Sequence, residues 1–335
     1  MKQKIKNYKK AVVLLNMGGV SKKGELEIFL TNMFNDENII TVKSNRLRSF
    51  IASMIVRFRR GEASENYESI NNASPILRLT RSLVKKLQKK FGAKDSSDTL
   101  VTFAMRYTPP YADSAVKQLK KYKIKIKEVF LLPLYPQYST TTVKSSLEEI
   151  MPLLDRALPL VKISYIKRFY QNKSFVKLIA HTIANIVPDK DKIKNYSLLF
   201  SAHSLPQKII TRGDSYEIEL NAQIKLIKKE LEKQGLLPRE IILAYQSKLG
   251  PIKWLGPSLE HTIRNFVGYK NKKGKEIKKV IVYPISFTID NAETTFELSI
   301  EAKELAEKNG FNQFIVCPSP NDSDEFVEIL HKMSA

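Results

Sequence analysis

Hydrophobic residues recur along this chain as short continuous runs that alternate with longer amphipathic stretches. Continuous apolar runs are typical of parallel strands that are covered on both faces. We therefore predict strands over 12–15, 100–105, 128–134, 161–166, 197–200, 241–244, 279–285 and 314–317.

The amphipathic stretches predict helices. The stretch 75–91 has Ser74 as an N-cap, Pro75 at the first helical position and Gly92 as a C-cap. Other helices are predicted over 173–186, 216–234 and 291–309. Such alternation of strands and helices indicates an α/β fold with parallel sheets.

The predicted strands divide into two sets of four, which indicates two doubly wound domains of similar plan. We expect two Rossmann-like domains, each a four-stranded parallel sheet flanked by helices, over 1–170 and 171–335. The helix 173–186 would carry the chain between them, and the final helix is free to pack back on the first domain.

Ligands bind beyond the carboxyl ends of strands in folds of this kind. Of the four histidines, only His203 follows a predicted buried strand directly, within Phe200–Pro206. His181, His261 and His331 lie in helical patterns. Imidazole accepts protons near neutral pH and ligates Fe(II), so His203 is the first candidate for chemistry.

Glu293 follows the predicted strand 279–285. One interpretation is a simple helix start, because Asp290 and Glu293 have the spacing of a capping box. The other is a cation or proton path, because Glu293, Glu297 and Glu301 recur every four residues. Like charges at that spacing destabilise a helix mildly, but spacing alone leaves both interpretations open.

The formal charge of +22 favours anionic partners, which include nucleic acid, anionic lipid and carboxylated small molecules. The basic residues are dispersed and follow no zinc-finger or basic-region pattern, so we expect no nucleic-acid partner. The single cysteine, Cys317, excludes an internal disulfide and a Cys-ligated iron–sulfur cluster. It fits a reducing compartment, and no stretch is long enough for a transmembrane helix, so we expect a cytoplasmic protein, at most peripheral to the membrane.

Two further segments suggest a binding role. Trp254 is the only tryptophan, and its Gly and Pro neighbours suggest a loop that lines a cleft, although a lone Trp is more often core. The segment 45–60 predicts a helix with Phe50, Ile51, Met54, Ile55 and Phe58 on one face, surrounded by several arginines. That helix is either packed on its domain or a basic, apolar lip over the ligand cleft, which is also able to touch anionic membranes.

Several of these segments together resemble the ferrochelatase family, in the right order over roughly residues 11 to 320. The first half carries L-N-M-G-G at 15–19, S-P-I at 74–76, M-R-Y at 105–107 and Y-P-Q-Y-S at 135–139. The second half carries F-S-A-H-S-L-P at 200–206, R-G-D-x-Y at 212–216, Q-S-K-x-G-P at 246–251, W-L-G-P at 254–257 and F-T-x-D-x-x-E-T at 287–294.

The resemblance implies insertion of Fe(II) into protoporphyrin IX, the terminal step of haem synthesis, with iron as a substrate and no tightly bound cofactor. It implies that the porphyrin binds in a cleft between two Rossmann-like domains. His203 and Glu293 match the family's catalytic and metal-contacting pair. The matches to its porphyrin pocket are Met17, Arg106, Tyr107, Tyr135 and Trp254.

One position departs from the family pattern, because Asn291 stands where a second histidine is frequent. An amide carries no proton at neutral pH, so a relay through that position is in doubt. The alternatives are a coproporphyrin ferrochelatase, a cobalt chelatase, and a porphyrin- or haem-binding protein without catalysis. The last is disfavoured, because simple binding needs no base opposite a ligand.

Overall fold

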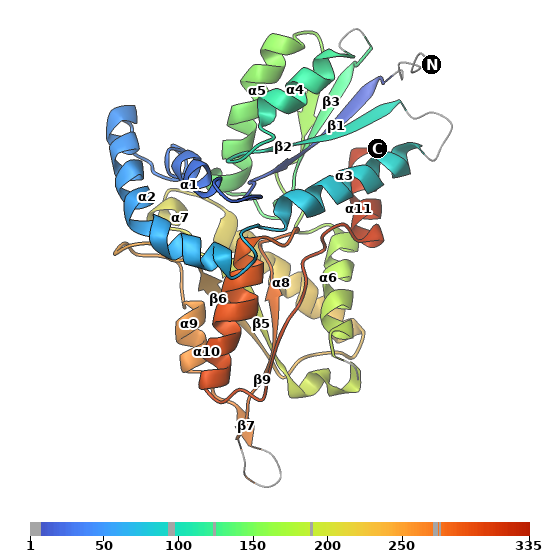
Figure 1. Ribbon diagram of the computed structural model, residues 1–335. Helices are drawn as coiled ribbons and strands as arrows, with labels where there is room; N and C mark the ends of the chain where they lie inside the picture. The colour runs from blue at the N-terminus through green and yellow to red at the C-terminus, as the bar shows by residue number, and fades with distance from the viewer. Residues whose placement is uncertain (1–7, 93–97, 123–124, 188–189, 271–273, 275) are drawn as a thin grey trace. The chain divides into compact units, whose positions relative to one another are not determined.

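The computed structural model describes residues 8–92, 98–122, 125–187, 190–270, 274 and 276–335. The chain divides into two compact units (Figure 1). Unit 1 comprises Met1–Lys167 and Asn321–Ala335, and unit 2 comprises Arg168–Pro320. The predicted boundary at residue 170 lies close to this division.

Unit 1 is built on a four-stranded parallel sheet in the order β2-β1-β3-β4. The strands are β1 (Lys10–Asn16), β2 (Thr99–Met105), β3 (Glu128–Pro133) and β4 (Lys162–Tyr165). The central strand β1 is apolar and buried along almost its whole length, as a strand covered on both faces must be.

The helices of unit 1 cover both faces of its sheet (Figure 1). They are α1 (Leu26–Phe34), α2 (Asn45–Glu68), α3 (Ile76–Gly92), α4 (Ala112–Lys120), a π-helix η1 (Thr140–Lys144), α5 (Ser145–Ala157) and α11 (Asp324–Ser334). The apolar sides of α4 and α5 pack with β1 and β3 in one hydrophobic core. The last helix, α11, packs on α3.

Unit 2 has a second four-stranded parallel sheet, in the order β10-β9-β5-β6. Its strands are β5 (Ser197–His203), β6 (Glu240–Gln246), β9 (Lys279–Pro284) and β10 (Gln313–Val316). The short strands β7 (Tyr269–Lys270) and β8 (Glu276–Ile277) form an antiparallel pair of their own.

The helices of unit 2 are α6 (Lys173–Asn185), a 3-10 helix η2 (Lys190–Asn195), α7 (Gln207–Thr211), α8 (Tyr216–Lys233), α9 (Leu259–Arg264), a π-helix η3 (Glu293–Glu301) and α10 (Ala302–Lys308). Residues of α9, η3 and α10 share one core with the sheet. Helices α6 and α8 pack together on the other side of the sheet (Figure 1).

The two sheets share one topology, because in each the first strand lies between the second and the third. The connection that follows the first strand and the one that follows the third strand run in opposite directions along the sheet. Folds of this kind bind ligands between the carboxyl ends of these two strands. In unit 2 this switch point lies between β5 and β9, which end at His203 and Pro284.

The predicted α/β fold with two four-stranded parallel sheets is confirmed, and all eight predicted strands are present. Three predicted details were wrong. Helix α2 continues to Glu68 instead of ending at Arg60, and α3 includes Gly92. The predicted helix 291–309 is a π-helix followed by an α-helix, because an extra residue enters each of its first turns.

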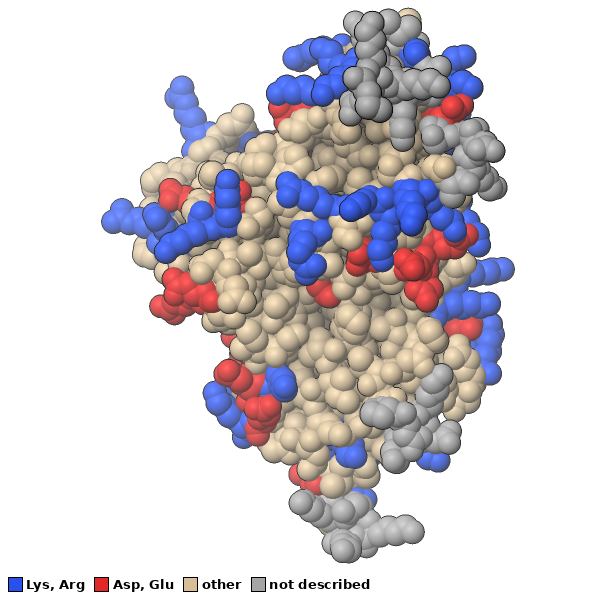
Figure 2. All heavy atoms as spheres, turned by 45° about the vertical axis from the view of Figure 1, so that its right-hand side comes forward, with Lys and Arg blue, Asp and Glu red and all other residues tan. Residues whose placement is uncertain are grey.

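The formal charge of +22 places many basic side chains on the surface. On the face shown in Figure 2, Lys and Arg side chains form several separate groups, with acidic side chains between them. In the described part of the chain, no helix combines the length and the apolar character that crossing a bilayer requires.

Candidate active site

His203 is the last residue of β5, and its backbone is held on both sides. Its N–H donates to Ser286 Oγ at 3.0 Å, and its carbonyl accepts from the Tyr216 hydroxyl at 3.0 Å. The register of β5 and β6 sets His203 beside Gln246. The side chain remains 37% exposed, so the imidazole is fixed in position and still accessible.

The structure brings His203 and Glu293 together, with 2.8 Å between Nδ1 and Oε2. The same carboxylate oxygen accepts from Gln246 Nε2 at 3.3 Å and lies 3.1 Å from Ser247 Oγ. Gln246 is oriented by Ser201, whose hydroxyl donates to its Oε1 at 2.6 Å. Glu293 is therefore directed at the imidazole by groups from β5 and β6.

The pair favours an imidazolium beside a carboxylate. Burial alone would lower the pKa of His203, but the charge of Glu293 and its hydrogen bond raise it above the usual value. Burial would raise the pKa of Glu293, but His203 and the hydroxyl and amide donors lower it. Nε2 of His203 makes no hydrogen bond within the described residues and is left for a ligand.

Glu297 lies one turn further along η3 and is linked to Glu293 by a hydroxyl. Ser247 Oγ lies 2.6 Å from Glu297 Oε2. Burial and the charge of Glu293 raise the pKa of Glu297 to about 8. One hydroxyl proton cannot serve two carboxylates, so both contacts are hydrogen bonds when Glu297 is protonated and donates to Ser247.

The helix that carries Glu293 is capped by Asn291, not by the pair Asp290 and Glu293 that one of the two interpretations named. Asn291 makes the cap instead: its buried Oδ1 accepts from the N–H groups of Glu293 at 2.8 Å and Thr294 at 3.3 Å. Asp290 accepts from the Ser319 N–H at 3.1 Å. Since Asn291 caps the helix, the Glu293 carboxylate is released to meet His203.

The stripe of three glutamates lies on the π-helix η3. Ser299 Oγ donates to the carbonyl of Thr294, five residues earlier. Glu297 is half-buried and Glu301 is exposed, so the row leads from the imidazole toward solvent. Within the described residues, no three His, Cys, Asp or Glu side chains gather as a metal site.

Trp254 lies in a loop that pairs with the segment after His203. It forms an isolated bridge with Pro206, and the N–H of Leu255 donates to Leu205 O at 2.9 Å. The half-buried indole donates its N–H to Leu249 O at 3.0 Å. The loop residue Ser247 has φ +63°, an uncommon value for a residue with a side chain, and such backbone is typical of functional sites.

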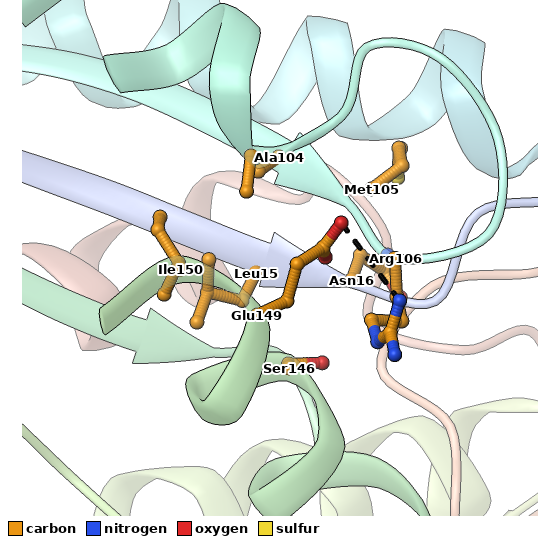
Figure 3. A pocket seen from close by; sticks show the side chains of 9 residues that line it. Leu15, Asn16, Ala104, Met105, Arg106, Ser146, Glu149 and Ile150 are labelled. Carbon is orange, nitrogen blue, oxygen red and sulfur yellow. Dashed lines mark ion pairs between the residues drawn. The ribbon is translucent and has the colours of Figure 1, made fainter. Parts of the chain in front are cut away.

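The other predicted porphyrin contacts lie in unit 1, beyond β1, β2 and β3. Met17 is half-buried, and its carbonyl accepts from the Tyr107 N–H at 2.9 Å. Arg106 lies at the end of β2 beside Glu149 (Figure 3). Tyr107 and Tyr135 are buried, and their hydroxyls contact Asp36 and Ser146. Their contact with a porphyrin stays a prediction.

The polar groups that bridge or orient the pair, Ser247 and Gln246, were not predicted as site residues. Their position just after β6 was visible in the sequence, but their contact with Glu293 depends on the pairing of β5 with β6. In unit 1, Asp36 and Glu149 were missed because neither belongs to a strand end.

The family model described as Ferrochelatase matches residues 9–335. This chain belongs to the ferrochelatase family. The predicted family and enzyme class, a metal-chelating lyase, are thereby confirmed.

Relatives carry the same description over nearly the whole chain. The ferrochelatase of Sulfurimonas denitrificans is 45% identical over 322 residues, which cover 96% of this chain and 97% of the relative. The ferrochelatase of Nitratiruptor sp. is 44% identical, and the match covers 96% of this chain and 97% of that relative. The ferrochelatase of Helicobacter pylori is 37% identical, and the match covers 97% of this chain and 92% of that relative.

Solved chelatase-like structures share the fold of this family member. SirB from Bacillus subtilis with Fe3+ has a TM-score of 0.54 at 13% identity, covering 98% of this chain and 96% of SirB. DR2241 from Deinococcus radiodurans, described as structurally similar to chelatases, has a TM-score of 0.56 at 12% identity. It covers 97% of this chain and 55% of that protein.

Proposed function

We propose that this chain inserts Fe(II) into protoporphyrin IX to form protohaem, the terminal step of haem biosynthesis. The observation that supports this most directly is the contact of His203 with Glu293 at a ligand-binding strand end. A porphyrin must lose two pyrrole protons as the metal enters, so the site needs proton acceptors beside a metal ligand.

Nε2 of His203 is the atom that meets the substrate. Glu293 accepts from Nδ1, so loss of the proton on Nε2 leaves a neutral imidazole with its lone pair outward. That lone pair can accept a pyrrole proton or contact Fe(II). Glu293 stabilises the imidazolium that forms, as a carboxylate beside a catalytic histidine does.

The first proton returns from Nε2 to solvent, to which the imidazole is open, and the second pyrrole proton is accepted by Glu293 and leaves along the carboxylate row. Glu293 passes it to Ser247, whose hydroxyl gives its own proton to ionised Glu297, and Glu301 continues the path toward solvent. The balance is one porphyrin and one Fe(II) in, and one haem and two protons out. Iron is a substrate, no resident cofactor takes part, and a single cysteine cannot hold an iron–sulfur cluster.

The test is an anaerobic assay of the purified protein with Fe(II) and protoporphyrin IX, followed by absorbance. We expect loss of the free-base bands and growth of the protohaem spectrum. Parallel reactions with coproporphyrin and with Co(II) are expected to be slower. Binding of protoporphyrin without metal insertion would contradict the proposal.

Replacing Ser247 by alanine is expected to slow iron insertion roughly tenfold, the effect of one lost hydrogen bond of ~1.4 kcal/mol in the transition state. Wild-type turnover should rise as pH increases through about 8, because ionised Glu297 can then accept a proton. The variant should lack that rise, since the proton path is interrupted. A pH series of initial rates measures both effects.

Ser299→Ala is the control for this variant, because it removes a hydroxyl from the same helix that bonds only the backbone of Thr294. It should keep the wild-type rate and pH profile. A Ser247→Ala profile that still rises through about pH 8 would remove Ser247 from the path.

We also propose that α2 contacts anionic membrane at the cell's inner face. Its outward row consists of Leu47, Phe50, Met54 and Phe58, with exposed fractions of 50%, 63%, 40% and 76%. The exposed side chains of Arg46, Arg57 and Arg60 lie on the same helix, and Arg60 also pairs with Glu27 at 3.0 Å. An apolar row bordered by cations matches the boundary between lipid headgroups and acyl chains. Arg48 is not available, because it donates to Asn35 O and Val42 O.

Serine at both Phe50 and Phe58 is expected to weaken binding to phosphatidylserine vesicles at least tenfold. Removal of one phenyl group from an apolar phase costs about 1.5–3 kcal/mol, and 1.4 kcal/mol is tenfold. Vesicle pelleting measures the effect. Ile218→Ser, which removes a 72% exposed apolar side chain in unit 2, is the control. Equal pelleting of all three proteins would contradict membrane contact through α2.

A further inference from the structure

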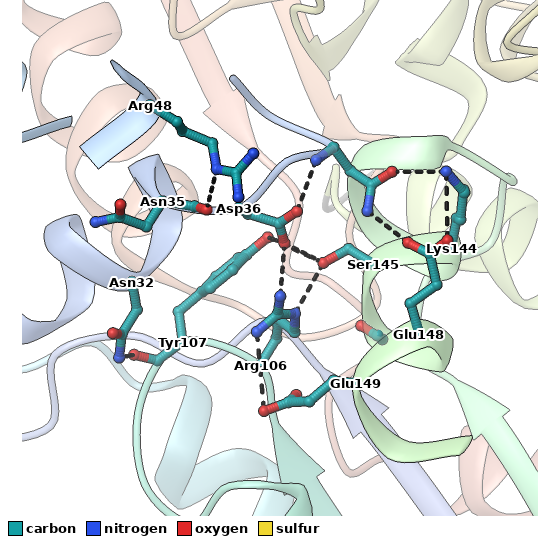
Figure 4. A network of polar contacts seen from close by, with 12 residues as sticks. Asn32, Asn35, Asp36, Arg48, Arg106, Tyr107, Lys144, Ser145, Glu148 and Glu149 are labelled. Atoms are coloured by element: carbon teal, nitrogen blue, oxygen red, sulfur yellow. Dashed lines mark hydrogen bonds and ion pairs between the residues drawn. The ribbon is translucent and has the colours of Figure 1, made fainter. Parts of the chain in front are cut away.

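The guanidinium of Arg106 is bracketed by carboxylates in unit 1 (Figure 4). One NH2 group lies 3.0 Å from Asp36 Oδ2, and Nε donates to Ser145 Oγ at 2.8 Å. Asp36 also accepts from the hydroxyls of Tyr107 and Ser145, and its side chain is 1% exposed. The NH2 and Nε groups of Arg106 are therefore engaged by neighbouring side chains of the protein.

The other edge of the guanidinium is held loosely. Its NH1 lies 3.8 Å from Glu149 Oε1, which is an ion-pair distance but too long for a hydrogen bond. The side chains of Arg106 and Glu149 are 23% and 24% exposed, so both are partly open to solvent. Figure 3 shows Glu149 on α5 turned toward Arg106 across a small, largely apolar pocket.

The carboxyl of Glu149 lies near Arg106 and near other acidic groups, and together with burial these set its pKa. Burial raises the pKa of Glu149 to about 7, while the charge of Arg106 lowers it and those of Asp36 and Asp113 raise it further. The phenol of Tyr135 also faces this group, and burial keeps its pKa above the ordinary value. Near neutral pH, Glu149 is therefore divided between a neutral and a charged form.

We propose that Glu149 is a specificity-determining positioning residue, which must take up a proton before a carboxylate of the porphyrin can bind the free edge of Arg106. This inference rests on the proposed function, because it takes the ligand to be a dicarboxylic porphyrin. Ionised Glu149 competes for NH1 and repels the incoming anion. Protonated Glu149 leaves NH1 available and can donate a hydrogen bond to the ligand.

The size of the effect follows from the protonated fraction. Apparent affinity falls in proportion to the population of the binding-competent form. With a pKa of about 7, that population is roughly tenfold smaller at pH 8 than at pH 6. The dissociation constant of a dicarboxylic porphyrin should therefore rise roughly tenfold over this interval, and that of a neutral porphyrin should not.

The experiment measures porphyrin binding without iron, by fluorescence quenching at pH 6, 7 and 8. It compares the wild-type protein with Glu149→Gln, which mimics the protonated side chain, and with Glu148→Gln. Glu148 is the matched control on α5, because its carboxylate bonds Asn38 and Lys144 instead of Arg106. The ligands are a free-base dicarboxylic porphyrin and its dimethyl ester.

We expect the wild-type protein and Glu148→Gln to bind the diacid roughly tenfold more weakly at pH 8 than at pH 6. Glu149→Gln should bind it equally at both, and no protein should show the dependence with the ester. A Glu149→Gln variant that keeps the wild-type dependence, or an ester that shows it, would overturn the inference. Iron insertion by the wild-type and Glu148→Gln proteins at saturating porphyrin tests the proposed function separately, because neither measurement depends on a change at Glu149.

Discussion

Replacing His203 by alanine is expected to lower the turnover number for iron insertion by about 10³-fold or more. Proton transfer by a positioned side chain contributes roughly 10²–10⁴-fold to a rate, and in the proposed reaction Nε2 of His203 also contacts the metal. The imidazole is held by Glu293, and the backbone of His203 is fixed by two further hydrogen bonds, so the ring is positioned for the reaction. Initial rates with Fe(II) and protoporphyrin IX measure the loss.

The fold should survive this change, because the His203 side chain is 37% exposed and fills no core position. Porphyrin binding without metal should stay within about threefold of wild type, since the residues predicted to contact the porphyrin are unchanged in this variant. His181→Ala, on the exposed surface of α6, is the control and should keep full activity. A folded His203→Ala protein with near-normal turnover would refute the assignment of His203 as the reacting base.

Replacing Glu293 by glutamine should lower turnover by about 10²–10³-fold, a range set by the loss of one positioned proton acceptor. The amide keeps the size of the side chain and removes its charge. The pKa of His203, which the charge and hydrogen bond of Glu293 raise, should fall. NMR titration of the His203 ring protons reports this change independently of catalysis.

Two observations separate this role from a structural one. Glu260→Gln, which removes a carboxylate from an exposed ion pair with Arg264, should leave both the rate and the His203 titration unchanged. A Glu293→Gln variant with normal His203 titration and normal turnover would mean that the contact at 2.8 Å has no part in the reaction.

The strands were predictable because their apolar runs are continuous, and only strands buried on both faces need such runs. The strand ends followed from this, and they located His203 at the carboxyl end of β5, which it closes as the last residue. Short elements were less visible. The two-residue strands β7 and β8 bury little apolar surface, so hydrophobic pattern does not reveal them.

The π-helix could not be predicted from the spacing of its glutamates. An α-helix and a π-helix differ in their hydrogen-bond pattern but can be formed by the same types of residue. The sequence 293–301 is therefore compatible with both. Asn291 shows the same limit. From the sequence, Asn291 was notable only for replacing a histidine that could carry a proton. In the structure its side chain caps the helix.

By itself, the sequence determined the strands, the α/β class, the family and the residue types for proton and metal chemistry, because burial pattern and motif order are properties of the chain. The tertiary structure alone decided which side chains meet. Glu293 contacts His203, although 90 positions separate them in the sequence, because β5 and β9 are parallel neighbours. Ser247 joins Glu293 to Glu297 only because β6 ends beside them. The charge on each carboxyl follows from these contacts and from burial, which no spacing along a chain specifies.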